Sequence, residues 1–304
     1  MSNKQFLALP YGKDDFTKLR AQDCYFVDKT PYIKQVFGVD SSDVLLLTRP
    51  RRFGKTLLMS MFDSFLKINP EKPFDNSKQL ELFKGTKILE DKEFCDKFMG
   101  QCPVIAVSLK DMEADTFEEA YKMFADIVWD VSKRYFYLLN SNKLDESDKV
   151  ILRQLTDINY LEDINNSQRV KNSLKNLATF LYKEYGRQPI LLIDEPLAKA
   201  SYHDLDDKRR HKKEPDYEPT FHKRMVTLMS GFLGVLKNNI GNESPISKTV
   251  ITGCLKVAKN SIFTGVNNLN VNTVISTDMD LTGIIGFTKD ETYKFLEDYE
   301  MDDY

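Results

Sequence analysis

The sequence predicts an α/β fold, a three-layer sandwich in which helices cover a mostly parallel β-sheet. Short runs rich in Val, Ile and Leu recur along the chain and are apolar on both faces, as strands of a helix-covered sheet must be. Amphipathic helical patterns lie between these runs, so that consecutive strands are joined by crossovers of the length that parallel strands need.

Five segments are expected to form strands. They are apolar, β-branched or leucine-rich, and short enough to cross a sheet once. Four have clear patterns, and the fifth is weaker: Val44–Thr48, Val104–Leu109, Ile190–Ile193, Thr249–Ile251 and, less clearly, Val271–Ile275.

Three apolar stripes with a spacing of 3.6 residues predict helices that pack against this sheet. The middle one follows a Thr116–Glu119 capping box, a signal that starts a helix. We expect these side chains to form the core and assign them no chemistry: Leu58, Met61, Phe62 and Phe65; Phe117, Phe124, Ile127, Val128 and Val131; Leu174, Leu177, Ala178 and Leu181.

The composition indicates a soluble cytoplasmic protein that folds as one continuous domain. Its 304 residues are 41% hydrophobic, and 43 basic against 46 acidic side chains give a net charge of −3, so no global excess predicts nucleic acid or a membrane as partner. No run approaches the roughly 18 apolar residues of a membrane span. The cysteines Cys24, Cys95, Cys102 and Cys254 lack the paired spacing of zinc or thioredoxin motifs, which favours a reducing compartment.

A candidate phosphate-binding loop lies between the first strand and the helix that follows it. Backbone N–H groups of such a loop point at one spot, and the helix dipole favours an anion there. Lys55 could neutralise the β- and γ-phosphates, and Thr56 could offer its hydroxyl to Mg²⁺. The candidate residues are Arg49, Pro50, Arg51, Arg52, Phe53, Gly54, Lys55, Thr56 and Leu57.

Two features of this loop leave alternatives open. Arg49 occupies the position where the usual pattern begins with glycine, and a chance Gly-Lys-Thr on a basic turn is the competing interpretation. Arg49, Arg51 and Arg52 could each contact phosphate or a carboxylate, or lie on a solvated, ion-paired face.

The segment Gln188–Glu195 predicts a buried strand that ends in two adjacent carboxylates. Asp194 could hold Mg²⁺, while Glu195, on the opposite side of the pleat, could orient and deprotonate the attacking water. Pro196 should keep Glu195 in extended geometry. A strand that simply meets a polar turn is the alternative.

In P-loop ATPases with an inserted strand between the phosphate loop and the acidic strand, the next strand presents a polar sensor beside the γ-phosphate. Thr252 is the natural candidate for this role and is a third catalytic candidate with Lys55 and Glu195. Tyr11, Phe16 and Phe26 are candidates for packing against an adenine ring, and the alternative is that they are aromatic core residues.

Several segments, in order along most of the chain, together resemble the AAA-ATPase-like family, predicted AAA-ATPases that often carry a C-terminal PD-(D/E)XK nuclease-like domain. In that family an arginine is expected at the position of Arg49. The matching segments are Phe26–Thr30, Arg49–Thr56, Leu191–Glu195, Leu197–Ala200, Thr252–Leu255, Ser261–Asn268 and Gly286–Thr288.

The resemblance implies a P-loop NTPase of the additional-strand (ASCE/AAA-like) type, with strand order 5-1-4-3-2 and with ATP and Mg²⁺ at the sites above. Residues 1–287 would form the ATPase domain and residues 288–304 the first helix of a truncated lid, with the nuclease-like domain missing. The chain departs from the family where Glu195 runs directly into Pro196 and where Lys256 replaces an expected arginine. A basic segment, Asp206–Glu214, looks like an insertion and is expected to be a solvated loop.

The leading hypothesis is therefore a Mg²⁺-dependent ATP hydrolase that acts as a nucleotide-driven conformational switch through a lid, a protein partner or another copy of itself. The alternative is a scaffold module that binds nucleotide without hydrolysing it. A weaker third hypothesis is nucleic-acid binding through the basic segment, with affinity that falls as salt rises.

Overall fold

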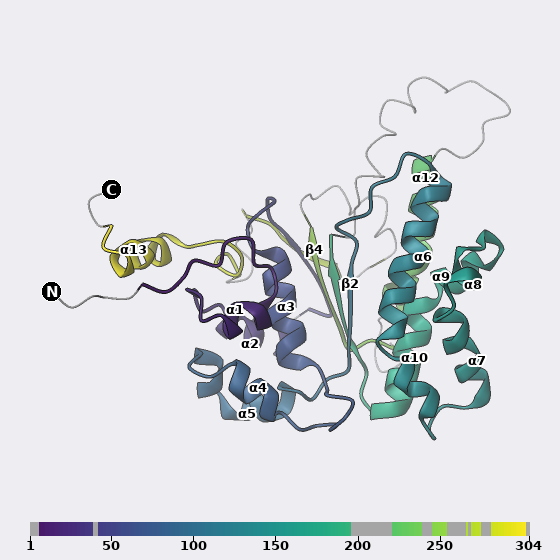
Figure 1. Cartoon of the computed structure of the whole chain (residues 1–304), viewed down its shortest axis with the longest axis horizontal. Coiled ribbons are helices and arrows are strands. Elements are labelled where there is room, and N and C mark those ends of the chain that lie inside the picture. Colours follow the sequence, from purple (N-terminus) through teal and green to yellow (C-terminus); the bar gives the residue numbers. More distant parts are fainter. Residues whose placement is uncertain are drawn as a thin grey trace. The chain divides into compact units, whose positions relative to one another are not determined.

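The computed structural model describes residues 6–38, 42–195, 221–238, 245–253, 266, 269–274 and 281–301 (Figure 1). The chain divides into two compact units. Unit 1 comprises Met1–Ser41, Thr48–Cys102 and Asn272–Tyr304, and unit 2 comprises Ser42–Leu47 and Pro103–Val271.

The strands are β1 (Val44–Thr48), β2 (Val104–Ser108), β3 (Ile190–Asp194), β4 (Lys248–Gly253) and β5 (Leu269–Asn272). The helices of unit 1 are α1 (Phe16–Ala21), α2 (Pro31–Phe37), α3 (Lys55–Leu66), α4 (Ser77–Leu82), α5 (Lys92–Phe98) and α13 (Lys289–Asp298). Those of unit 2 are α6 (Phe117–Lys133), α7 (Glu146–Leu155), α8 (Ile158–Glu162), α9 (Ser167–Lys171), α10 (Ser173–Tyr185) and α12 (Phe221–Phe232).

The five strands form one sheet in the order β2-β3-β4-β1-β5. Read from the β5 edge, this order is 5-1-4-3-2, the series that the resemblance implied. β3 pairs in parallel with β2 and with β4, and Asp194 lies in register with Ser108 on one side and Thr252 on the other. The carboxyl ends of these three strands therefore meet at one edge of the sheet.

The expected strands are found with small shifts at their ends. β1 has the expected bounds, and β3 continues one residue further, to Asp194. β5 begins at Leu269, two residues before the expected start, and ends at Asn272. All five residues of β1 and of β3 are buried, as parallel strands covered on both faces require.

The core of unit 2 forms where helical stripes pack on the sheet. α6 and α10 both contact β2, and their apolar residues join Ile105, Leu191 and Ile193 in one cluster. The hydroxyl of Thr116 accepts a hydrogen bond from the N–H of Glu119, so the helix begins where its cap was expected.

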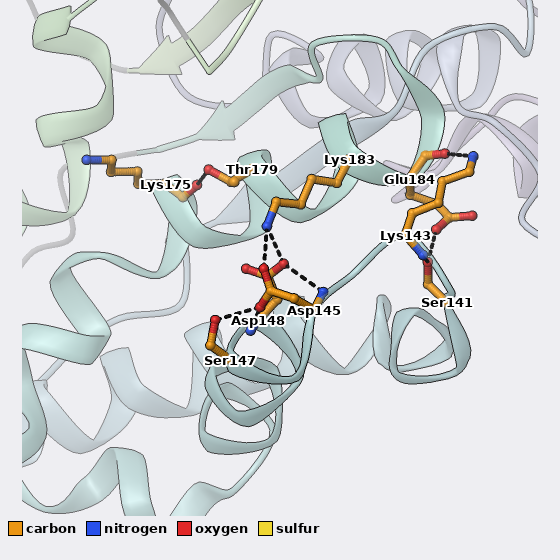
Figure 2. A network of polar contacts seen from close by, with 9 residues as sticks. All are labelled: Ser141, Lys143, Asp145, Ser147, Asp148, Lys175, Thr179, Lys183 and Glu184. Atoms are coloured by element: carbon orange, nitrogen blue, oxygen red, sulfur yellow. Dashed lines mark hydrogen bonds and ion pairs between the residues drawn. The ribbon is translucent and has the colours of Figure 1, made fainter.

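A polar network joins α7 to α10 on the side of unit 2 shown in Figure 2. Lys183 on α10 contacts Asp148 at 2.5 Å and Asp145 at 3.1 Å, and these two acids form the capping box of α7. Hydrogen bonds from Ser147 and the N–H of Asp148, together with Lys183, hold the pKa of Asp145 far below its ordinary value. The two capping carboxylates thus connect the start of α7 to α10 through Lys183.

The core of unit 1 is rich in aromatic rings. Phe16 packs against the rings of Phe26 and Phe83, and Phe65 packs against Phe83 and Phe94. This answers the question left open for Phe16, which is 0% exposed and is a core residue.

Within the part of the chain that is described, no helix is long and apolar enough to span a membrane. Cys24, Cys95 and Cys102 are buried and form no disulfide among the residues that the structure describes. Burial, with the nearby charges of Asp91 and Asp96, raises the pKa of Cys95 to about 11, so this thiol stays protonated at neutral pH.

Candidate functional site

The candidate phosphate loop of unit 1 connects Thr48, the last residue of β1, to Lys55, the first residue of α3. Gly54 caps the helix in the left-handed region with φ of 91°, where a residue without a Cβ is favoured. Arg52 is also left-handed, with φ of 66°. Left-handed residues in a tight turn build the backbone concavities that bind anions.

The loop presents its backbone to solvent at the start of a helix. The residues from Pro50 to Gly54 are exposed, and the N-cap residue of α3, Gly54, has no side chain that could cap the first turn. Because the first N–H groups of a helix have no partner within it, this end of α3 offers donors and a positive dipole to an anion.

Lys55 extends back over the loop. Its side chain is buried, and Nζ donates to the carbonyl oxygens of Pro50 at 3.0 Å and Arg49 at 3.3 Å. These two carbonyl groups help to hold the ammonium group at the loop. A phosphate oxygen would be a stronger acceptor for the same donor.

Arg49 supports the loop from inside the fold. Its side chain is 3% exposed, and its guanidinium donates to the carbonyl of Thr48, the carbonyl and side-chain oxygens of Asn272, and the carbonyl of Leu281. Burial lowers the pKa of Arg49. The side chain therefore braces the first residue of the loop and is not displayed on its surface.

The other two arginines of the loop, Arg51 and Arg52, have exposed side chains. Phe53 is also half exposed, and its carbonyl accepts a hydrogen bond from the N–H of Gly286 at 3.1 Å. Thr56 and Leu57 follow in the first turn of α3 and are partly buried.

Asp194 and Thr252 form the polar end of the sheet in unit 2. Both are buried, and the hydroxyl of Thr252 donates to Oδ1 of Asp194 at 2.5 Å. The strand registers explain the contact, because Asp194 and Thr252 are paired residues of β3 and β4. One carboxylate oxygen is thereby oriented by a neighbouring hydroxyl.

The expectation of extended geometry for Glu195 is wrong. Glu195 has φ of 52°, in the left-handed region, and its N–H donates to the carbonyl of Thr252 at 2.9 Å. β3 ends at Asp194, so Glu195 lies just outside the strand and not on the opposite side of its pleat. A non-glycine residue in this region is strained, and such strain concentrates at functional sites.

The candidate residues thus form two groups, one in each unit. Arg49–Leu57 form the loop and the first turn of α3 in unit 1, and Asp194, Glu195 and Thr252 share hydrogen bonds in unit 2. Among the described residues, no group of three or more His, Cys, Asp or Glu side chains could hold a metal ion by itself. A metal at Asp194 would need further ligands, such as phosphate oxygens, a hydroxyl and water.

Two contacts of the loop escaped the sequence analysis. Asn272 accepts two of the hydrogen bonds of Arg49. Leu281 accepts another from Arg49, and Gly286 donates to the carbonyl of Phe53. The Gly286–Thr288 string was a signal for the second contact, although nothing in it showed where the segment would pack. Lys256, the basic segment Asp206–Glu214 and most of Ser261–Asn268 lie outside the described residues.

A family model described as "Predicted AAA-ATPase" matches residues 10–263, a range that includes the phosphate loop, β3 and β4. No curated protein and no solved structure matches the chain.

Proposed function

The chain belongs to the family of predicted AAA-ATPases, and from this premise we propose that it binds ATP with Mg²⁺ and hydrolyses it. The observation that carries the proposal is the exposed loop between β1 and α3, whose helix starts at a left-handed glycine and whose lysine is held over the loop. Together with the buried Asp194 at the end of β3, this supports a P-loop NTPase of the additional-strand type.

The triphosphate would bind at the loop. N–H groups of Phe53, Gly54 and Lys55 and the dipole of α3 would surround the phosphates, and Nζ of Lys55 would exchange its two carbonyl acceptors for phosphate oxygens. Arg51 and Arg52 are placed on the exposed side of the loop, where a guanidinium can reach an anion.

Asp194 and the hydroxyl of Thr56 are the residues that would hold Mg²⁺. The carboxylate fits this role because it is buried, oriented by Thr252 and composed of the oxygen ligands that Mg²⁺ prefers. When bound, the ion would neutralise charge on the phosphates.

Glu195 would orient the attacking water and accept its proton. Thr252 would act through its hydroxyl group, which donates a hydrogen bond to Asp194 in the structure. Turnover would then alternate the protein between nucleotide states and make it a conformational switch.

A second candidate function, nucleotide binding without hydrolysis, is favoured by the backbone of Glu195. The residue turns out of β3, whereas the hydrolytic hypothesis was built on a carboxylate that continues the strand. A module of this kind would keep the loop and Asp194 but would not activate water.

One experiment separates the two functions. We would measure binding of Mg²⁺·ATP by calorimetry and phosphate release by the wild type, Lys55→Ala and Glu195→Gln. The hydrolytic proposal predicts that Lys55→Ala loses binding and that Glu195→Gln binds ATP but releases at least tenfold less phosphate, because general base catalysis contributes roughly 10²–10⁴-fold. Binding without phosphate release by the wild type would establish the second function, and no binding at all would overturn both.

A further inference from the structure

Two stretches noted in the sequence have no role in the proposed function, Phe26–Thr30 and Gly286–Thr288. Within unit 1 they are joined by Lys29, whose side chain is buried. Nζ of Lys29 donates to both carboxylate oxygens of Glu291 and to the carbonyl of Gly283, each at 2.6 Å. One ammonium group thus holds the two ends of the segment from Gly283 to Glu291.

Glu291 also fixes the start of α13. Its carboxylate accepts from the N–H of Thr288 at 2.7 Å, and its own N–H donates to the hydroxyl of Thr288 at 3.2 Å, which completes a capping box. No residue of α13 is fully buried; near its far end the ring of Phe295 packs against Tyr25, and the hydroxyl of Tyr25 donates to Asp298, so the capping box is one of two sets of contacts that hold the helix.

The stretch from Leu281 to Gly286, which includes Gly283, contacts the phosphate loop at two points. The carbonyl of Leu281 accepts from the buried guanidinium of Arg49 at 3.2 Å, and the N–H of Gly286 donates to the carbonyl of Phe53 at 3.1 Å. Gly283, which Lys29 binds, lies between these two contacts in sequence. The segment therefore touches the loop at its first residue and at the residue before Gly54.

Both glycines are needed for this close packing. A Cβ at Gly283 would lie 2.4 Å from the hydroxyl of Tyr32, and a Cβ at Gly286 would lie 3.1 Å from the ring of Phe53. Gly286 also has φ of 84°, which other residues rarely adopt. A side chain at either position would displace the segment from its present contacts.

We propose that Lys29 and Glu291 are positioning residues of the phosphate loop, acting through the segment 281–288 that they hold against Arg49 and Phe53. As far as it concerns nucleotide affinity, this inference rests on the proposed function. The loop's backbone donors bind phosphate well only if their geometry is fixed beforehand, because ordering them during binding costs affinity. Removal of the ion pair releases the segment and lets the loop move.

Hydrogen exchange of the nucleotide-free protein tests the positioning role directly. We would compare Lys29→Met, which removes the charge, with Glu291→Gln, which keeps an acceptor for the N–H of Thr288. The matched control is Lys34→Met, which breaks the exposed ion pair between Lys34 and Asp91 in the same unit. Peptides that cover α6, in unit 2, report any global loss of stability.

We expect faster exchange in peptides covering 49–57 and 281–291 in both test variants, with no change in the control or in α6. Faster exchange confined to α13 would overturn the proposal, because the ion pair would then stabilise only its own helix. Equal effects in Lys34→Met, or faster exchange throughout the chain, would also overturn it.

Nucleotide binding gives a second measurement. Loss of the anchor should weaken the affinity for Mg²⁺·ATP by about five- to tenfold, the effect of one or two hydrogen bonds, while the rate at saturating ATP changes less. Gly286→Ala should weaken affinity similarly, whereas Gly85→Ala, at φ of 79° with open space around it, should not. If the wild type binds no ATP, the proposed function fails while the exchange measurement still decides the positioning role.

Discussion

The hydroxyl of Thr252 faces the carboxylate of Asp194, and this contact changes what Thr252 is expected to do. Thr252 is 0% exposed, and its hydroxyl donates to Oδ1 of Asp194 at 2.5 Å. Its first effect is therefore to orient the carboxylate that would bind the metal. Ion binding and catalysis depend on such supporting hydrogen bonds, because they fix the direction of the ligand.

Thr252→Val tests this role, since valine has nearly the shape of threonine without the hydroxyl. We expect the Mg²⁺ concentration needed for half-maximal ATP binding to rise about tenfold, which is the lower range for loss of a supporting hydrogen bond at a metal ligand. Thr252→Ser should restore most of the loss, because it keeps the donor. If valine changes the catalytic rate but not the Mg²⁺ requirement, Thr252 acts on the substrate and not through Asp194.

Glu291 gives the anchor of α13 a dependence on pH. Burial opposes ionisation of this carboxylate, but hydrogen bonds from Lys29 and from the N–H of Thr288 outweigh it and lower the pKa of Glu291. A carboxylate whose pKa is lower in the folded state stabilises the fold above its ordinary pKa, and this stabilisation is lost as pH falls through the folded value.

We therefore expect the stability difference between wild type and Glu291→Gln to be largest near neutral pH and to shrink as the pH falls below 4.5, the ordinary value for glutamate. Urea unfolding at a series of pH values measures this difference. A difference that grows in acid would show that the charge of Glu291 is not what Lys29 stabilises.

At the scale of single elements, the clearest strands and helices follow from local patterns, and their ends depend on partners. β1 has the expected bounds because four consecutive apolar residues and Thr48 lie between polar residues and the phosphate loop. β5 was expected two residues too late, since its pattern is weak and its position is set by pairing at the edge of the sheet. Short helices such as α4 and α5 have too few turns for a 3.6-residue period to stand out.

The same distinction holds for the candidate site. The loop from Arg49 to Leu57 could be located from the sequence because its chemistry is local to one turn. The support of Arg49 by Asn272 could not, because the two residues are 223 positions apart and meet only in the fold. The left-handed backbone of Glu195 was missed because the rule for a residue before proline predicts extended geometry.

The start of α6 offers a prediction for one element. Thr116 accepts from the N–H of Glu119, so Thr116→Ala removes the only side-chain cap described at this helix end and should lower the free energy of unfolding by about 1 kcal/mol. Thr179→Ala is the control, because Thr179 lies inside α10 and its hydroxyl bonds only the carbonyl of Lys175. Denaturant titration should show a smaller loss of stability for Thr179→Ala than for Thr116→Ala. Equal losses would contradict a capping role for Thr116.

At the scale of the whole molecule, the proposed function assigns residues of both units to one nucleotide. The loop residues belong to unit 1, whereas Asp194 and Glu195 belong to unit 2. If both groups act on the same Mg²⁺·ATP, binding should stabilise both units, because a ligand stabilises every part of the fold that it requires to be ordered.

Hydrogen exchange with and without Mg²⁺·ATP would measure this coupling. At a ligand concentration of about 100 times Kd, a single site adds roughly 2.7 kcal/mol to the stability of the bound state. We expect added protection in peptides covering 49–57 and 190–195, and we expect Lys55→Ala to abolish it in both units at once. In Asp194→Asn we expect Mg²⁺·ATP to add protection to neither unit, whereas ATP without Mg²⁺ should still protect the loop weakly. Protection of the loop without any change in β3 would mean that unit 1 binds the phosphates by itself, and Asp194 would then have no part in the site.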